Sequence, residues 1–157
     1  MTKTQLTLVG IFSLSTLLGT VLASAASIRI QAADSTDYCL DPKGNSAYGS
    51  VVVLKPCSAL NLQQDQQWSL HSGVIESQVN TNTCLDVTGA HASLGTPVQI
   101  YNCNGTVAQK WTYANGALHS FSGSDLCLDV PGANFYDGAP VQIWDCNGTN
   151  AQNWRIK

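Results

Sequence analysis

The sequence is short of charge. Only 11% of its 157 residues are Asp, Glu, Lys or Arg, against roughly 25% in average soluble proteins. With a hydrophobic content of 44%, this excludes a charge-rich disordered chain. Seven basic residues are scattered among ten acidic ones, and no Lys/Arg cluster occurs. Because a nucleic-acid-binding protein needs a basic stripe that follows the phosphates, nucleic acid is excluded as a partner.

Long apolar runs are also missing after the N-terminal segment. Residues 6–22 are mostly apolar, follow Lys3, and lead into Ala23-Ser24-Ala25, the small-x-small pattern of a cleavage site. We expect residues 1–25 to be a signal peptide and residues 26–157 to be a secreted, extracellular domain without membrane insertion. An uncleaved membrane anchor is the alternative, although polar residues interrupt the run.

Metal-binding cysteine patterns are absent. No Cys-x-x-Cys occurs, and the three histidines stand at no ligand spacing from the cysteines, so we expect no metal and no cofactor. The six cysteines all follow the apolar run, which is typical of disulfides formed during export.

A threefold repeat organises the rest of the chain. Cys39, Cys84 and Cys127 each open a Cys-Leu-Asp triplet, at spacings of 45 and 43 residues. A second cysteine follows each of them after 18, 19 and 19 residues. Trp68, Trp111 and Trp154 recur at intervals of 43 residues, each two positions after a glutamine. The repeats therefore span about residues 26–70, 71–113 and 114–157.

The repeat selects one disulfide per unit: Cys39–Cys57, Cys84–Cys103 and Cys127–Cys146. Each bridge closes a loop that is worth roughly 3 kcal/mol in the chain-entropy model. Units of about 43 residues are too small to bury a core alone, so the three must pack together.

The local pattern of the repeats is that of strands. Short alternating runs such as residues 97–101 and 140–144 are separated by turn residues, including Asn115-Gly116 and Asp137-Gly138. Helical periodicity is hard to find. About four short strands per repeat predict a closed all-β assembly with threefold pseudosymmetry.

These features resemble those of the ricin B-type β-trefoil lectins. The resemblance rests on three Gln-x-Trp motifs in register with six matching cysteines and three Cys-Leu-Asp triplets, and it covers residues 26–157. It implies a β-trefoil fold and carbohydrate binding, with one shallow pocket available in each repeat.

Strand alternation predicts where a sugar would lie. In residues 141–144, alternation sends Val141 and Ile143 to the core and Gln142 and Trp144 to the surface. An exposed ring stacks on the C–H face of a pyranose, and an ionised carboxylate bonds two neighbouring hydroxyls. The disulfide ties the Cys-Leu-Asp carboxylate to the same strand. The resemblance assigns these roles to two sets of residues: Asp129, Gln142 and Trp144 in the third repeat, and Asp86, Gln99 and Tyr101 in the second.

The sequence departs from the family in two ways. Ala108 and Ala151 stand where the family places an asparagine that contributes to sugar binding, so each site lacks one hydrogen bond. In the first repeat, Val53 and Lys55 replace the amide and the ring. We therefore expect that repeat to be structural and the Asp41 carboxylate to cap a turn.

Several of these residues can have a structural role instead of binding sugar. Trp68, Trp111 and Trp154 recur even in the incomplete repeat, which favours core positions, and the preceding glutamines are expected to satisfy nearby backbone groups. Asp86 and Asp129 can be turn residues. Trp144 can be buried beneath the loop of residues 134–136.

Two glycosylation sequons occupy matching places, Asn104-Gly105-Thr106 and Asn147-Gly148-Thr149. Both follow the second cysteine of their repeat, close to the expected sites, so that attached glycans would crowd bound sugar.

The expected function is a secreted lectin that binds terminal sugars, of galactose or N-acetylgalactosamine type by resemblance, at about 1 mM for each site. An enzyme is disfavoured because each repeated carboxylate stands alone, whereas glycoside hydrolysis needs a facing pair. The alternative is a protein-binding trefoil such as a protease inhibitor. The oligomeric state is left open.

Overall fold

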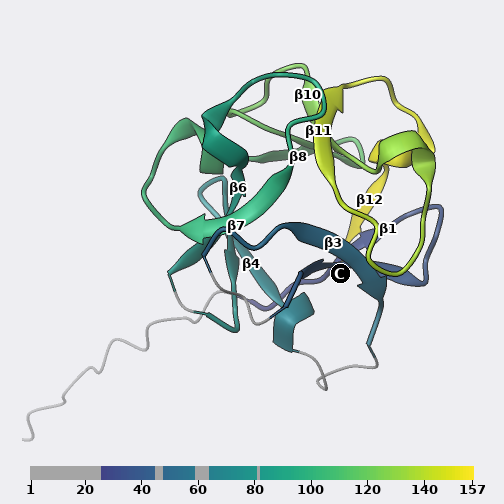
Figure 1. The fold of residues 1–157 in the computed structure, drawn as a ribbon, viewed down its shortest axis with the longest axis horizontal. Coiled ribbons are helices and arrows are strands. Elements are labelled where there is room, and N and C mark those ends of the chain that lie inside the picture. Colours follow the sequence, from purple (N-terminus) through teal and green to yellow (C-terminus); the bar gives the residue numbers. More distant parts are fainter. Residues whose placement is uncertain (1–25, 45–47, 59–63, 81) are drawn as a thin grey trace, which may run out of the picture.

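The computed structural model describes residues 26–44, 48–58, 64–80 and 82–157. The expected signal peptide, residues 1–25, lies outside them. The described chain consists of short strands and single-turn 3-10 helices arranged around a central core (Figure 1). None of the helices in these ranges has the length and apolar character needed to cross a bilayer.

Twelve strands form three four-stranded antiparallel sheets. The first sheet has the order β12 (Trp154–Ile156), β1 (Ile30–Ala32), β2 (Tyr38–Pro42) and β3 (Val52–Pro56). The second has the order β4 (Trp68–His71), β5 (Val74–Ser77), β6 (Thr83–Val87) and β7 (Val98–Asn102). The third has the order β8 (Thr112–Ala114), β9 (Ala117–His119), β10 (Leu126–Asp129) and β11 (Gln142–Asp145). The 3-10 turns are η1 (Gln64–Gln66), η2 (Thr88–Ala90), η3 (Val107–Gln109), η4 (Pro131–Ala133) and η5 (Asn150–Gln152).

The sheets do not coincide with the repeats. The last strand of each sequence repeat pairs with the first strand of the next, so that β4 pairs with β5, β8 with β9, and β12 with β1. The β1–β12 pair brings the two ends of the domain together and closes the ring. Each repeat therefore completes its neighbour's sheet, which is why a single repeat has no complete core of its own.

The core lies where the three sheets converge. Trp68, Trp111 and Trp154 are each at most 2% exposed and lie among buried aliphatic side chains from all three repeats. Each indole N–H donates to the carbonyl of the leucine of a Cys-Leu-Asp triplet, Leu40, Leu85 or Leu128. The tryptophans are core residues, as the repeat pattern predicts.

The three disulfides join Cys39 to Cys57, Cys84 to Cys103 and Cys127 to Cys146. Each ties the strand that carries Cys-Leu-Asp to the end of its partner strand. The β-trefoil fold with one disulfide per repeat is thus confirmed.

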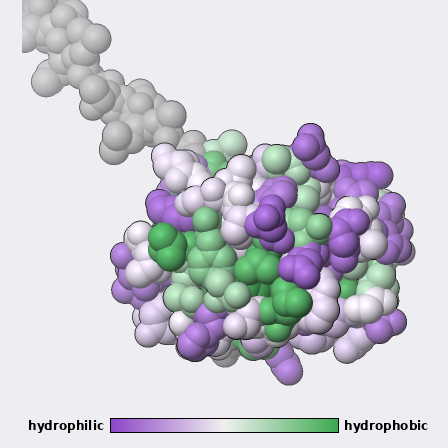
Figure 2. Space-filling model, turned by 90° about the horizontal axis from the view of Figure 1, so that it is seen from above, coloured by the Kyte–Doolittle hydropathy of each residue, from purple (hydrophilic) through white to green (hydrophobic). Residues whose placement is uncertain are grey.

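On the surface seen from above, apolar side chains gather in the middle and hydrophilic ones surround them (Figure 2).

Candidate functional site

The third-repeat residues lie on one hairpin. Strand register places Asp129 directly opposite Gln142, and Cys127 opposite Trp144. Val141 and Ile143 are buried, so the alternation of the strand turns Gln142 and Trp144 outward. Gln142 Nε2 donates to Asp129 Oδ1 at 2.9 Å. Carboxylate, amide and indole therefore share one face.

A second glutamine fixes the carboxylate from the other side. Gln152, of the Gln-x-Trp motif, is 2% exposed and donates to Asp129 Oδ2 at 3.1 Å. It also donates to the Asp145 carbonyl at 2.8 Å and accepts from the Asn147 N–H at 2.8 Å. The motif glutamine satisfies backbone groups, as expected, and in addition orients the carboxylate. Asp129 is held by two amides and still has lone pairs for a ligand.

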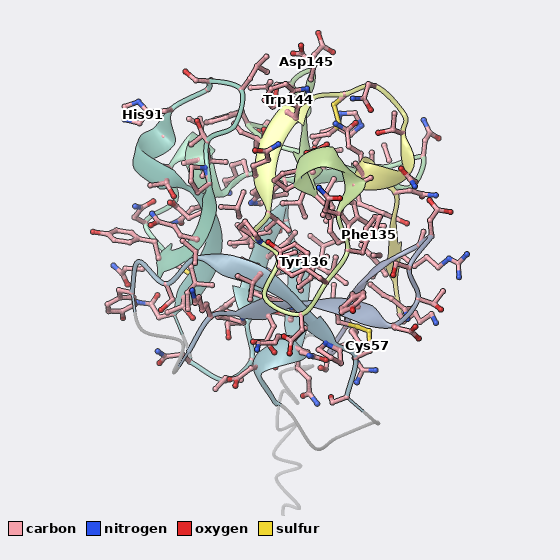
Figure 3. All side chains as sticks on the ribbon, turned by 45° about the vertical axis from the view of Figure 1, so that its right-hand side comes forward. Cys57, His91, Phe135, Tyr136, Trp144 and Asp145 are labelled. Atoms are coloured by element: carbon pink, nitrogen blue, oxygen red, sulfur yellow. A yellow bond between two sulfur atoms is a disulfide. The ribbon has the colours of Figure 1, made fainter. Side chains whose placement is uncertain are left out.

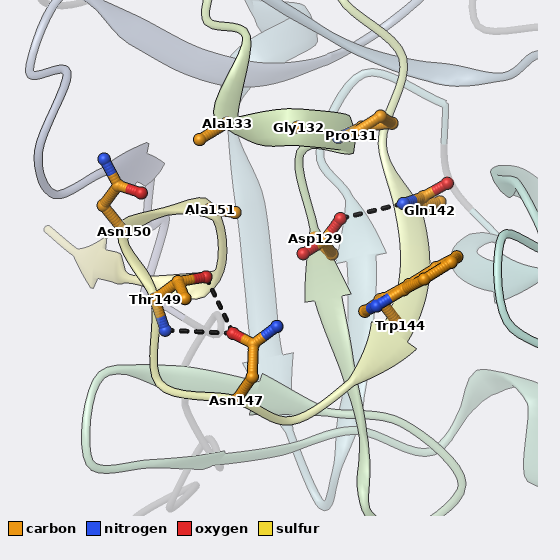
Figure 4. A pocket seen from close by; sticks show the side chains of 10 residues that line it. All are labelled: Asp129, Pro131, Gly132, Ala133, Gln142, Trp144, Asn147, Thr149, Asn150 and Ala151. Atoms are coloured by element: carbon orange, nitrogen blue, oxygen red, sulfur yellow. Dashed lines mark hydrogen bonds between the residues drawn. The ribbon is translucent and has the colours of Figure 1, made fainter.

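These side chains border a cavity of about 440 Å³ (Figure 4). Asp129, Gln142 and Trp144 form one wall, and η4 and the segment 147–151 form the others. Trp144 is 38% exposed. It lies well away from Phe135 and Tyr136, so the loop of residues 134–136 does not cover it (Figure 3).

The η4 turn requires a left-handed backbone. Gly132 has φ +61°, and a Cβ there would lie 2.9 Å from Asn134 Nδ2. A side chain at position 132 would therefore be strained by the backbone and would displace the Asn134 side chain.

The segment after Cys146 supplies cavity-lining residues beyond the carboxylate, amide and ring. Asn147 Oδ1 accepts from Thr149 N at 3.0 Å and from Thr149 Oγ1 at 2.7 Å. This leaves Asn147 Nδ2 directed into the cavity (Figure 4). Asn150 and Ala151 also line it. The signal available in the sequence was the position of Asn147, three residues after Trp144 and next to the disulfide.

The second repeat has the same construction. Asp86 lies opposite Gln99, whose Nε2 donates to Asp86 Oδ1 at 2.8 Å, and Gln109 Nε2 donates to Asp86 Oδ2 at 3.0 Å. Tyr101 is 44% exposed. The cavity here is about 350 Å³. Its lining consists of Asp86, Gly89, Ala90, Gln99, Tyr101, Asn104, Thr106 and Ala108.

The first repeat lacks this arrangement. Val53 lies opposite Asp41, and Lys55 occupies the position of the ring. Lys55 Nζ forms an ion pair with Asp137 Oδ1 at 2.9 Å. The carboxylate of Asp41 accepts a hydrogen bond from Gln66. This repeat has the carboxylate without the amide and ring beside it.

One cluster among the described residues has metal-ligand geometry that the sequence spacing did not indicate. His119 Nδ1 lies 3.5 Å from Cys146 Sγ and 3.7 Å from Cys127 Sγ. The two sulfurs are bonded to each other, so they offer no thiolate to a metal.

Comparison with known proteins agrees with this geometry. The family model of the ricin-type β-trefoil lectin domain matches residues 26–154. No curated protein matches the chain. Among solved structures, the designed threefold symmetric protein ThreeFoil is 27% identical with a TM-score of 0.71, and the alignment covers 83% of this chain and 96% of that one.

Two natural proteins share the fold. The C-half of the earthworm R-type lectin, in complex with GalNAc, is 21% identical with a TM-score of 0.69, covering 83% of this chain and 97% of that one. A non-toxic homologue of type II RIPs from Momordica charantia (bitter gourd), in complex with α-methyl-D-galactoside, is 22% identical with a TM-score of 0.69. That alignment covers 84% of this chain and 48% of the other, so the chain spans about half of that protein's length. The chain belongs to the ricin-type β-trefoil lectin family, whose domains bind carbohydrate and are not catalytic.

Proposed function

We propose that this protein is a secreted lectin that binds terminal sugars of galactose type through two sites, in the second and third repeats. The observation that carries the proposal is the repeated unit of an exposed ring beside a carboxylate that two amides hold. Asp129 and Asp86 are each 4% exposed, so little of either carboxylate faces water apart from its side toward the cavity. The two complexes with galactose-type sugars support the choice of sugar.

The third site offers a sugar both an apolar surface and hydrogen-bonding groups. Trp144 supplies an apolar surface for the C–H face of a pyranose. Asp129 has acceptor capacity left for two hydroxyls, and Gln142 keeps one amide hydrogen and its carbonyl oxygen. Asn147 Nδ2 adds a donor on the opposite wall. These few contacts fit an affinity of about 1 mM, or roughly −4 kcal/mol, for a single sugar.

Two weak sites gain strength from multivalency. The sites face outward from neighbouring repeats, so a branched glycan or a glycosylated surface can engage both. The second contact is then made at high effective concentration, which raises avidity without any new contact.

Secretion fits the same proposal. Three disulfides stabilise a domain that is expected to follow a signal peptide, and disulfides persist in extracellular compartments. The two sequons are then accessible to glycosylating enzymes, and we propose that Asn104 and Asn147 are N-glycan acceptors whose occupancy controls their sites, so that sugar binds to the molecules in which the acceptor is free. Because Asn147 Nδ2 points into the third cavity and Asn104 lines the second, a glycan on either would close its site.

A glycan array tests the function. Unglycosylated protein from a non-glycosylating host is compared with Trp144→Ala and Tyr101→Ala. We expect wild type to bind glycans with terminal galactose or N-acetylgalactosamine, each single variant to keep one of two sites in calorimetric titration, and the double variant to bind none.

The competing function is a protein-binding trefoil such as a protease inhibitor. A folded wild-type protein that binds no glycan would overturn the lectin proposal. Protease inhibition that is unchanged in Trp144→Ala would favour the alternative.

A further inference from the structure

Three equivalent loops, one in each repeat, contact a strand of the next repeat. Each contains a glycine whose N–H donates to a strand of the following repeat. The bonds are Gly49 N to Ile100 O at 2.8 Å, Gly95 N to Ile143 O at 2.9 Å, and Gly138 N to Leu54 O at 2.7 Å. Each acceptor directly precedes the outward position that carries Tyr101, Trp144 or Lys55. The loop of one repeat is thus held against the site of its neighbour.

The residue before each glycine therefore lies near that neighbouring position, and it differs in the three loops. Asp137 forms the ion pair with Lys55 in the first repeat. Leu94, which is 47% exposed, precedes Gly95 beside Trp144. Tyr48 faces Tyr101, with ring centroids 6.3 Å apart and ring planes inclined by 53°. Of these three outward positions, that of Tyr101 is the one where the neighbouring loop brings an aromatic ring against an aromatic ring.

The two tyrosines are not a buried structural pair. Tyr48 is 58% exposed and Tyr101 is 44% exposed, so both rings keep large surfaces in water. An exposed tyrosine combines an apolar face with a polar hydroxyl and loses little conformational freedom on binding. Two such rings at an angle form a corner whose surfaces can each contact one ring of a sugar chain.

We propose that Tyr48 is a binding residue of the second site, which takes a sugar chain of at least two residues. The terminal sugar contacts Tyr101 and Asp86, and the adjoining sugar contacts Tyr48. The third site, with Leu94 at the equivalent place, recognises the terminal sugar alone. This inference rests on the proposed lectin function and assigns different ligand lengths to its two sites.

The test uses a background in which only the second site reports. Unglycosylated Trp144→Ala protein is titrated with methyl β-D-galactoside and with lactose, with and without Tyr48→Ala. We expect Tyr48→Ala to weaken lactose binding by about tenfold and methyl galactoside binding by less than about twofold. Tyr48→Phe should restore lactose binding, because the ring face makes the contact.

Controls separate this role from a structural one. Leu94→Ala, at the equivalent loop position, should leave both affinities unchanged in this background. Equal losses for the two sugars, or no loss for either, would overturn the inference while leaving the lectin function intact. If neither the parent nor the wild-type protein binds either sugar, the galactose-type lectin proposal fails, and the inference fails with it.

Discussion

Asp41 and Val53 lie directly opposite each other across the β2–β3 hairpin, at the register position where aspartate faces glutamine in the other two repeats. Valine has no donor, so Asp41 lacks the strand amide that Asp86 and Asp129 receive. Burial raises the pKa of Asp41 above its ordinary 3.8, and the hydrogen bond from Gln66 opposes this only in part. The first repeat therefore retains a carboxylate that is poorly compensated in its ionised form.

This predicts that Asp41→Asn stabilises the protein near neutral pH. Because the folded state holds the Asp41 proton more tightly than the unfolded state, wild-type stability falls as pH rises from the unfolded pKa, near 3.8, through the raised folded pKa. Asparagine removes this loss and can still accept from Gln66. Urea denaturation at about pH 3 and about pH 7 should show the advantage only at the higher pH. A gain of the same size at both would contradict the assignment, and Asp125→Asn, at an exposed position of the third repeat, serves as control.

Truncating the two tryptophans of the third repeat should affect different properties: stability for Trp154 and sugar binding for Trp144. Trp154 is 1% exposed and donates from Nε1 to the Leu128 carbonyl at 3.0 Å, so Trp154→Ala should cost about 3–5 kcal/mol of stability. Trp144→Ala, at an exposed position, should change stability by less than about 0.5 kcal/mol and abolish third-site binding. Urea denaturation and sugar titration of both variants measure this. A large stability loss in Trp144→Ala would mean that its ring is structural.

Restoring the family's asparagine should strengthen the third site. Ala151 lines the cavity, and Ala151→Asn adds a donor and an acceptor there. One further hydrogen bond, at about 1 kcal/mol, corresponds to a several-fold increase in affinity. Calorimetry with methyl galactoside in a Tyr101→Ala background isolates the third site. Ala151→Leu adds volume without hydrogen bonding and should weaken binding, and an equal effect of both substitutions would refute the hydrogen-bond explanation.

Glycosylation at Asn147 should close the third site. Thr149→Val destroys the sequon with little change of shape, whereas Thr149→Ser keeps both the sequon and the hydroxyl bonded to Asn147 Oδ1. From a glycosylating host, the valine variant should carry one glycan fewer by mass spectrometry and bind more sugar than wild type or the serine variant. From a non-glycosylating host the serine variant should bind like wild type, and the valine variant should bind no more strongly than wild type, because only the Thr149 N–H still holds Asn147 Oδ1. A glycan on Asn147 without loss of third-site binding would show that it points away from the cavity.

Much of the fold follows from the sequence because the repeat fixes equivalent positions three times. The tryptophans, the disulfide pairs and the outward direction of Gln142 and Trp144 all depend on spacing within one repeat. Alternation along a strand decides which face a side chain takes, whatever the surrounding structure. The fold class and the grouping of each carboxylate with its amide and ring are consequences of these local rules.

Other features depend on how the repeats close on one another. Strands β4, β8 and β12 each join the sheet of the next repeat. Residues of different repeats also meet in the ion pair of Lys55 with Asp137 and in the contact of Tyr48 with Tyr101. Contacts of this kind have no fixed spacing in the chain, because the closure of the three sheets determines which loop meets which strand. The sequence by itself determined a threefold all-β domain in which two repeats each carry a carboxylate, an amide and an aromatic ring. The tertiary structure alone decided which neighbouring loop borders each set, because that contact exists only once the three repeats have packed around their shared core.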